Sequence, residues 1–227
     1  MKLLAVGNTA KVFLTEKQQV IKVYHKKYQS LAHVEYNNYL IAHKHGLPVS
    51  TRVSIEKSGN KHCLVLDYIN GVTIDQFKNH FSKKLEIFVS LQKAFNDKIE
   101  HSLRSYKELL IDCAENNISL INRIKKLPDQ NYICHGDFHF GNIIRSDNRY
   151  SVVDLVTMCR GPKEYDIANT VYLLYYKCGK LLSLKLLKKY LRLRGTSFLK
   201  LHPYIKVISL CDKLTIKRQK LENKYST

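Results

Sequence analysis

Residues 134–142 read CHGDFHFGN and residues 152–154 read VVD, and these two stretches decide which fold and chemistry the chain is expected to have. The first contains the pattern H-x-D-x4-N, which ends at Asn142. The second places Asp154 twelve residues after Asn142. Short β-rich runs lead into both stretches, which predicts that each follows a strand.

These residue types suit phosphoryl transfer. Asp137, in a loop after a strand, is placed to accept a proton from an attacking hydroxyl group. Asn142 offers a neutral oxygen ligand and Asp154 a carboxylate oxygen, and Mg²⁺ prefers such a sparse set, with water and nucleotide phosphates as its other ligands. Phosphoryl transfer needs these parts because its catalysis consists of positioning and charge neutralisation. The alternative is a coincidental polar turn between two strands.

The stretch resembles the catalytic loop and metal-binding aspartate of the protein-kinase-like superfamily. Its form, H-G-D-x-H-x-G-N, is similar to that of the aminoglycoside phosphotransferase and choline kinase branch. The resemblance implies that Asp137 is the catalytic base and that His135 braces the loop. It also implies that Asn142 and Asp154 are the ligands of Mg²⁺.

The sequence after Asp154 continues this resemblance. Residues 160–168, RGPKEYDIA, resemble the branch's segment R-G-D-P-x-x-D-L-A, although the aspartate before the proline is missing. Asp166 is expected to anchor the segment by accepting hydrogen bonds from backbone amides. A protein kinase needs a long activation segment to seat a peptide, but Asp166 follows only twelve positions after Asp154. The expected phosphoryl acceptor is therefore a hydroxyl group of a small molecule.

The N-terminal part offers candidates for the groups that bind nucleotide phosphates. Residues 20–23, VIKV, are a β-branched run around Lys22, and Glu35 lies thirteen residues later in a predicted helix. In the superfamily a strand lysine contacts the phosphates, and a helix glutamate pairs with it and keeps it charged. Residues 7–12, GNTAKV, stand where the superfamily has its phosphate loop, with one glycine instead of three. Thr9 and the loop amides are expected to reach phosphate oxygens. The alternative for residues 7–12 is an ordinary hairpin turn, and the alternative for Lys22 is an ordinary solvated lysine on a strand.

Residues 64–71, LVLDYING, resemble the strand that leads into the hinge of this superfamily. Backbone groups of that hinge pair with the purine edge, so the resemblance places the base near Asp67, Tyr68 and Ile69. The implied cofactors are ATP, or GTP, and Mg²⁺.

The spacing of apolar residues divides the chain in two. Residues 1–69 read as short strands around one helix, which begins near Ser30 and ends at Gly46. Residues 70–227 read as mainly helical, with a β-rich interval before Asp166. The expected fold class is α+β: a bilobal protein-kinase-like fold with a small β-rich N-lobe (1–69) and a larger, mainly helical C-lobe (70–227). Within the C-lobe, helices are expected at 75–81, 84–98 and 105–126, and strands at 132–134, 142–145 and 151–155.

The composition is that of a globular protein that builds its own core. Of the 227 residues, 44% are hydrophobic and 25% are charged, and no apolar run approaches the roughly 18 residues of a membrane span. The six cysteines include no C-x-x-C pair, which predicts reduced thiols in the core instead of a zinc clip or redox pair. No signal-peptide core follows Met1, so we expect a cytoplasmic protein.

The charge balance bears on the partners. The 38 Lys and Arg residues exceed the 19 Asp and Glu residues by 19, which favours anionic partners. Between residues 177 and 220, thirteen Lys and Arg residues stand against Asp212 alone. In the family this region helps to build the acceptor site, so a polycationic acceptor fits poorly there. A neutral or anionic acceptor, such as a sugar, a nucleoside or a phosphorylated metabolite, is expected.

Three functions follow from these patterns. The leading hypothesis is an ATP- or GTP-dependent phosphotransferase with a small hydroxylated acceptor. The second is a catalytically weak nucleotide-binding pseudokinase or scaffold, which the glycine-poor loop suggests. The third is a basic protein that binds RNA or a membrane surface, and it is not favoured over the first.

Overall fold

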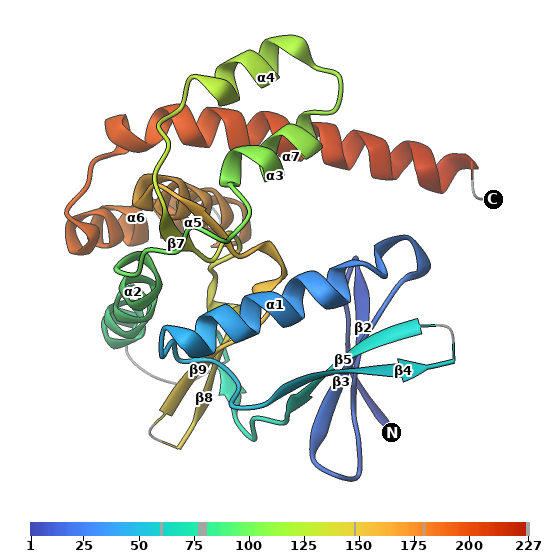
Figure 1. Cartoon of the computed structure of the whole chain (residues 1–227). Coiled ribbons are helices and arrows are strands. Elements are labelled where there is room, and N and C mark those ends of the chain that lie inside the picture. The colour runs from blue at the N-terminus through green and yellow to red at the C-terminus, as the bar shows by residue number, and fades with distance from the viewer. Residues whose placement is uncertain (60, 77–80, 148, 179, 226–227) are drawn as a thin grey trace. The chain divides into compact units, whose positions relative to one another are not determined.

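The computed structural model describes residues 1–225 except 60, 77–80, 148 and 179. Its contacts divide the chain into two compact units (Figure 1). Unit 1 consists of Met1–His80 and Phe140–Met158, and unit 2 of Phe81–His139 and Cys159–Thr227. This division differs from the expected ranges of 1–69 and 70–227, because residues 140–158 pack with the N-terminal part of the chain.

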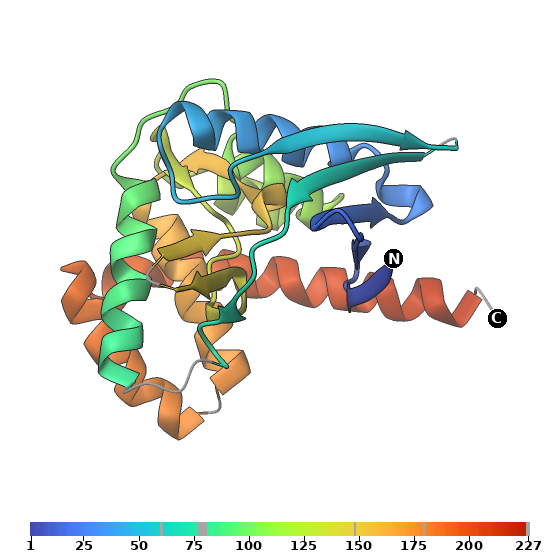
Figure 2. The ribbon, with the colours of Figure 1, turned by 90° about the horizontal axis from the view of Figure 1, so that it is seen from below.

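Unit 1 is built around an antiparallel five-stranded sheet (Figure 2). Its strand order is β1-β2-β3-β5-β4. Runs of β-branched and apolar residues form these strands, and short turns join β1 to β2 and β2 to β3. Lys22 and Tyr24, two positions apart on β3, are both buried because alternate side chains point to the same face. The strands are β1 (Lys2–Val6), β2 (Ala10–Leu14), β3 (Gln19–Tyr24), β4 (Val53–Ser58) and β5 (Lys61–Asp67).

Helix α1 (Leu31–Lys44) follows the short helix η1 (Lys26–Tyr28) and packs against β3, β4 and β5. Its buried residues recur at helical spacing along one face and include the polar Glu35 and Asn38. Ser30 precedes the helix as expected, but its side chain makes no capping hydrogen bond. The helix ends at Lys44 with His45 as its C-cap, and Gly46 follows with a φ of +63°, a conformation that favours glycine.

A smaller antiparallel sheet, in the order β6-β8-β9, explains why residues 140–158 belong to unit 1. Strand β6 (Val72–Thr73) pairs with β8 (Ile143–Ser146), which pairs with β9 (Arg149–Val152). The Val152 amide also donates to the Pro48 carbonyl at 2.6 Å. The short helices η2 (Phe140–Asn142) and η3 (Leu155–Thr157) flank this hairpin.

Unit 2 is mainly helical and encloses the two-stranded antiparallel pair β7 (Tyr132–Cys134) and β10 (Cys159–Gly161). Helix α5 packs against α6 and α7, and α2 packs against β7 and α6, as both ribbon views show. Within the described residues, no helix is both long and apolar enough to span a bilayer. The helices are α2 (Phe81–Asn96), α3 (Tyr106–Ala114), α4 (Ile118–Lys125), α5 (Lys163–Cys178), α6 (Lys180–Arg194) and α7 (Phe198–Tyr225).

Local backbone features shift three of the expected elements. The helix expected at 105–126 is two helices, because Glu115 has a φ of +53° and the Asn117 side chain caps α4 by accepting from the Leu120 amide. In the helix expected at 75–81, residues 74–76 form a turn and residues 77–80 lie outside the described residues. The strand expected at 151–155 ends at Val152, and a 3₁₀ turn begins at Leu155.

Candidate active site

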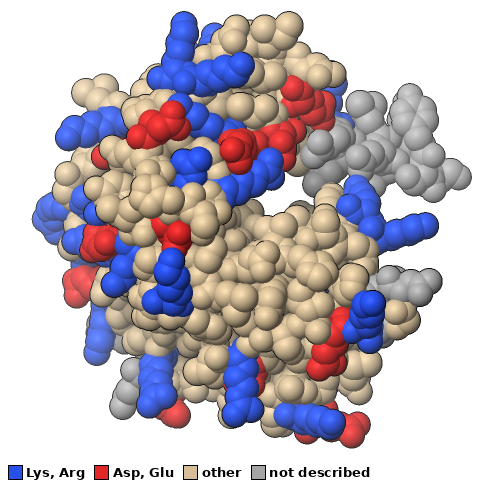
Figure 3. All heavy atoms as spheres, viewed as in Figure 1, with Lys and Arg blue, Asp and Glu red and all other residues tan. Residues whose placement is uncertain are grey.

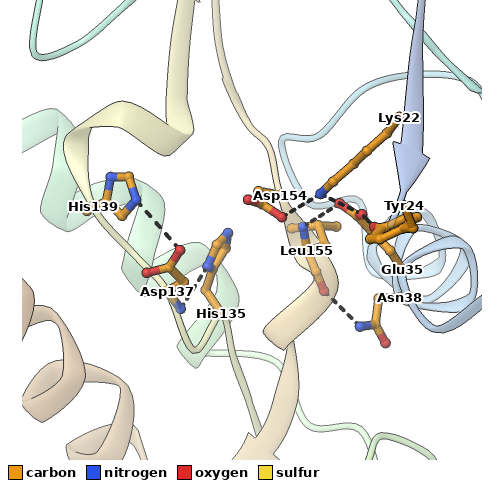
Figure 4. A network of polar contacts seen from close by, with 9 residues as sticks. All are labelled: Lys22, Tyr24, Glu35, Asn38, His135, Asp137, His139, Asp154 and Leu155. Atoms are coloured by element: carbon orange, nitrogen blue, oxygen red, sulfur yellow. Dashed lines mark hydrogen bonds and ion pairs between the residues drawn. The ribbon is translucent and has the colours of Figure 1, made fainter. Parts of the chain in front are cut away.

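A buried lysine lies between two carboxylates in unit 1 (Figure 4). The Nζ atom of Lys22, on β3, lies 2.8 Å from Oε2 of Glu35 and 2.7 Å from Oδ1 of Asp154. Glu35 is fully buried on α1, whereas the Asp154 side chain is 40% exposed. The structure thus brings together three of the residues that the sequence singled out, from three separate segments.

Glu35 also holds the backbone that follows Asp154. Its Oε1 accepts a hydrogen bond from the Leu155 amide at 3.0 Å, and its Oε2 accepts a further one from the Tyr24 hydroxyl. One turn along α1, the Asn38 side-chain amide donates to the Leu155 carbonyl at 2.8 Å. Sequence reasoning gave Asn38 no role in holding this backbone, although its place on the same helix face as Glu35 was a signal.

The charges around Lys22 change how it and its neighbours ionise. Burial alone would lower the pKa of the Lys22 ammonium, but Glu35 and Asp154 outweigh it, and the pKa lies above its ordinary value of 10.5. Burial and then the Glu35 carboxylate raise the pKa of the Tyr24 hydroxyl. Lys22 is therefore a permanent cation at neutral pH, and Tyr24 is a neutral hydrogen-bond donor.

Asp154 has an unusual backbone conformation for a residue that is not glycine. Its φ of 66° and ψ of 65° lie in the left-handed region, which costs about 1–3 kcal/mol and is concentrated at functional sites. The hydrogen bonds of Glu35 and Asn38 to the next residue hold the chain in this conformation. The conformation directs the Asp154 carboxylate toward Lys22 (Figure 4).

Asn142 lies close to Asp154 in the same hairpin. The Asn142 carbonyl accepts a hydrogen bond from the Val153 amide at 3.0 Å, one residue before Asp154, and the next residue, Ile143, pairs with Val152. Among the described residues, no group of three or more His, Cys, Asp or Glu side chains could hold a metal ion. One carboxylate and one amide oxygen on adjacent chain segments nevertheless fit Mg²⁺, which takes few protein ligands and fills its shell with water and phosphate.

Asp137 belongs to unit 2, in a loop that His135 stabilises. The Asp137 amide donates to Nδ1 of His135 at 3.2 Å, so this nitrogen accepts and the ring proton is assigned to Nε2. His135 is fully buried, with its ring against those of Phe95 and Phe138. Nε2 of His139 lies 3.6 Å from Oδ2 of Asp137 (Figure 4). The Asp137 side chain is 36% exposed.

Asp166 anchors this loop through its backbone. Oδ1 of Asp166, on α5, accepts the Gly136 amide at 2.9 Å; the sequence led us to expect a backbone amide as its partner, but not one from the catalytic loop. Its Oδ2 accepts from the side-chain amides of Asn96 and Gln92, each at 3.0 Å. All three of these hydrogen bonds are buried. Sequence reasoning overlooked Gln92 and Asn96, which occupy positions i and i+4 on the inner face of amphipathic α2.

The expected phosphate loop is a tight turn between β1 and β2. The Gly7 amide donates to the Ala10 carbonyl at 2.8 Å, which leaves Asn8 and Thr9 at the tip. The Thr9 carbonyl accepts the His25 amide at 2.8 Å. The turn is therefore tied to the end of β3, the strand that carries Lys22.

The expected hinge follows β5, which ends at Asp67. The Asp67 carboxylate accepts a hydrogen bond from the Thr51 hydroxyl at 2.7 Å. The Tyr68 amide donates to the Gln18 carbonyl at 3.1 Å, so a purine would have to use other backbone groups of this segment. Tyr68 and Ile69 are half-buried and lie outside any helix or strand.

Comparisons with known proteins identify a matching family and similar solved structures. Residues 83–201 match the model of the family described as "Phosphotransferase enzyme family". The chain is similar to the solved aminoglycoside-3'-phosphotransferase of type VIII, with 17% identity and a TM-score of 0.68 over 94% of this chain and 91% of that one. It is also similar to APH(3'')-Id from Streptomyces rimosus, solved with ADP and streptomycin, with 13% identity and a TM-score of 0.66 over 88% of this chain and 90% of that one. A third structure, APH(2")-IIia with GDP and kanamycin, gives 13% identity and a TM-score of 0.66 over 98% of this chain and 86% of that one.

At these identities the similarity to solved structures concerns the fold, and it confirms the expected α+β, protein-kinase-like fold class. None of the curated protein sequences matches the chain. The family model spans more than half of the residues and includes His135, Asp137, Asn142 and Asp154. The resemblance drawn from the catalytic loop is thereby confirmed, and the chain belongs to the phosphotransferase enzyme family.

Proposed function

We propose that the protein is an ATP- or GTP-dependent kinase that transfers the terminal phosphoryl group of the nucleotide to a hydroxyl group of a small molecule. The observation that carries the proposal is the position of Lys22, with one ammonium between the carboxylates of Glu35 and Asp154. A buried, permanently charged lysine beside a more exposed carboxylate suits the binding of a nucleotide phosphate together with a metal ion.

Each part of the site has a role in this proposal. Lys22 contacts the nucleotide phosphates, and Glu35 fixes its direction. Asp154 and Asn142 hold Mg²⁺, which supplies neutralisation of the phosphate charge when it is bound. Asp137 accepts the proton of the attacking hydroxyl group, and the His135 ring keeps the Asp137 backbone in place.

The other nucleotide contacts come from residues 1–69, the proposed N-lobe. The turn at Thr9 would reach phosphate oxygens through its hydroxyl and amides. The segment of Asp67, Tyr68 and Ile69 would receive the purine through backbone groups other than the Tyr68 amide. Such an enzyme would work in the cytoplasm, where ATP and Mg²⁺ are both present.

We also propose that the acceptor is neutral or anionic. The similar structures include complexes with kanamycin and streptomycin, which belong to those proteins. In the present chain, Lys and Arg side chains outnumber acidic ones over the face in Figure 3, in line with the formal charge of +19. Like charges across an interface reduce affinity, so a sugar, a nucleoside or a phosphorylated metabolite is favoured over a polycation.

The proposal is tested by measuring phosphoryl transfer from ATP and GTP, with Mg²⁺, to a panel of sugars, nucleosides, choline-like amines and aminoglycosides. Asp137→Asn should lower turnover by about 10²- to 10⁴-fold while nucleotide binding persists. Asp154→Asn should weaken the Mg²⁺-dependent part of nucleotide binding. Asp212→Asn, a substitution of equal charge on α7, is the control. Wild-type turnover in Asp137→Asn would overturn the assignment of the base.

The two-residue tip of the turn at Asn8 and Thr9, with one glycine, supports a second candidate: a nucleotide-binding scaffold with little catalysis. This candidate predicts a thermal shift with ATP and Mg²⁺ but no transfer to any acceptor.

The net charge supports a third candidate, a protein that binds RNA or an anionic membrane. For that candidate, salt-dependent binding to RNA or anionic vesicles would survive Asp154→Asn.

A further inference from the structure

Helix α6 carries a stripe of cations beside a surface pocket of unit 2. Lys185, Lys188, Lys189 and Arg192 occupy positions i, i+3, i+4 and i+7, which lie on one face of a helix. All four line a pocket of about 670 Å³ that the start of α2 completes. Both ribbon views show α2 beside α6 (Figures 1 and 2). The proposed phosphoryl transfer assigns none of these four side chains to catalysis or to nucleotide binding.

Within the described residues, little neutralises these cations. Lys189 is held by the hydroxyl of Ser82 and by Oε1 of Glu86 at 3.3 Å. In the part of the chain that the structure describes, no carboxylate forms an ion pair with the other three cations. By contrast, Lys163 elsewhere in unit 2 pairs with Asp97 at 2.6 Å. Four cations against one carboxylate leave the pocket with a formal charge of +3, which a ligand of opposite charge would compensate.

The shape and lining of the pocket favour a small molecule. Its volume falls within the range of about 300–1,000 Å³ that is usual for small-molecule sites. Leu186, which is buried, and Phe81, which is exposed, also line it and offer apolar surface to a carbon skeleton. Lysine ammonium groups bind phosphate as point charges, and an arginine adds a bidentate donor. We propose that this α2–α6 pocket binds a small organic molecule that carries two or more phosphate groups.

The test is isothermal titration calorimetry of the full chain, without nucleotide or Mg²⁺. The probes are fructose 1,6-bisphosphate and inorganic tripolyphosphate, and fructose is the uncharged control. The triple variant Lys185→Ala, Lys188→Ala, Arg192→Ala should weaken binding of both probes by about tenfold or more. Alanine favours helix, so α6 should persist, which circular dichroism checks.

A matched variant separates this pocket from general attraction of anions. Lys206→Ala, Lys213→Ala, Lys217→Ala removes the same charge from exposed positions of α7 and should leave the affinity unchanged. Lys22→Met should leave the affinity for fructose 1,6-bisphosphate unchanged, since Lys22 belongs to the proposed nucleotide site; tripolyphosphate is left out of this comparison because it resembles the triphosphate chain that Lys22 is proposed to contact. Equal weakening in both triple variants, loss of fructose 1,6-bisphosphate binding in Lys22→Met, or failure of both probes to bind the wild-type protein would overturn the proposal. The proposal would also be overturned if binding of RNA or anionic vesicles needed the three α6 cations while binding of the small probes did not.

Discussion

Lys22 and Asp154, 132 residues apart in the sequence, form an ion pair of 2.7 Å between Nζ and Oδ1. Glu35 links Lys22 to the backbone that follows Asp154. Its carboxylate pairs with the Lys22 ammonium and accepts a hydrogen bond from the Leu155 amide. Replacement of one residue of this group therefore alters the position of the others. The proposed phosphate contact and the proposed metal ligand form one cooperative unit within unit 1.

Lys22→Met should lower turnover by about 10²-fold or more, because a neutral side chain cannot stabilise charge on the transferring phosphoryl group. It should also weaken nucleotide binding. Glu35 keeps its hydrogen bonds from Tyr24 and Leu155 in this variant, so the fold should survive at a cost of about 3–5 kcal/mol. Steady-state kinetics and urea unfolding measure the two effects.

Lys163→Met is the matched control for Lys22→Met. Lys163 forms an exposed ion pair with Asp97, which contributes about 1 kcal/mol or less. Equal turnover in the two variants would contradict the phosphate contact proposed for Lys22.

Stability should fall steeply above about pH 10. The pKa values of Lys22 and of the Tyr24 hydroxyl are raised in the folded protein from ordinary values of 10.5 and 10.0. Burial also raises the pKa of Tyr39 well above 10.0. Below these ordinary values both states keep their protons, so the stabilisation is fully present; above them the unfolded chain loses protons that the folded chain retains.

Above its ordinary pKa, each group whose pKa is raised in the folded protein lowers the free energy of unfolding by about 1.4 kcal/mol per pH unit. Urea unfolding between about pH 8 and about pH 11 measures it, with tyrosinate absorbance as a second signal. Tyr24→Phe should remove one group's share of the slope. An unfolding free energy that stays constant up to pH 11 would contradict the raised pKa values.

Much of the fold was predictable because it is encoded locally. The β-branched run around Lys22 forms β3, and the helix expected after Ser30 forms α1 with Glu35 on its inner face. The break at Glu115 was not predictable from apolar spacing, because that spacing continues across it while the backbone takes a positive φ there. The place of residues 140–158 in unit 1 depends on the pairing of β6 with β8, a long-range contact that no local pattern encodes.

The candidate site also has a part that could be predicted from local sequence and a part that could not. The residue types at Asp137, Asn142 and Asp154 could be named from spacing within one stretch of sequence. The side chains that hold them could not, because Asn38 and Gln92 act on segments 117 and 74 residues away. In both cases the sequence signal is only a polar residue on the buried face of a helix. Such residues also occur far from any active site, because every buried polar group needs a hydrogen-bond partner.

Gly71→Ala should destabilise the protein by about 2 kcal/mol or more. A Cβ at this position would lie 2.2 Å from the Arg145 carbonyl oxygen and 2.9 Å from a side-chain carbon of Ile144. Strand β8 would have to move away from β6. Urea unfolding measures the loss.

Gly7→Ala is the control for Gly71→Ala, because its Cβ would lie 3.5 Å from the Ala10 carbonyl oxygen, at an ordinary contact distance. It should change stability by no more than about 0.5 kcal/mol. The close packing at Gly71 is refuted if the two alanine variants unfold at the same urea concentration.

Asp166→Asn should lower both stability and turnover. Three donors, from Gly136, Asn96 and Gln92, converge on the two oxygens of this buried carboxylate. An asparagine offers only one oxygen, and its NH₂ group would face at least one of the donors. The unsatisfied groups and the lost charge should cost about 2–4 kcal/mol, measured by urea unfolding.

The kinetic signature of Asp166→Asn should be specific. Gly136 precedes Asp137, so loss of its hydrogen bond to Asp166 should loosen the Asp137 loop and lower kcat. The KM for nucleotide should stay nearly constant, because Lys22 and Asp154 belong to unit 1. Asp212→Asn is the control: its oxygen can still accept the Tyr172 hydroxyl, so both parameters should match the wild type. A raised KM with an unchanged kcat in Asp166→Asn would mean that this network supports nucleotide binding instead of the Asp137 loop.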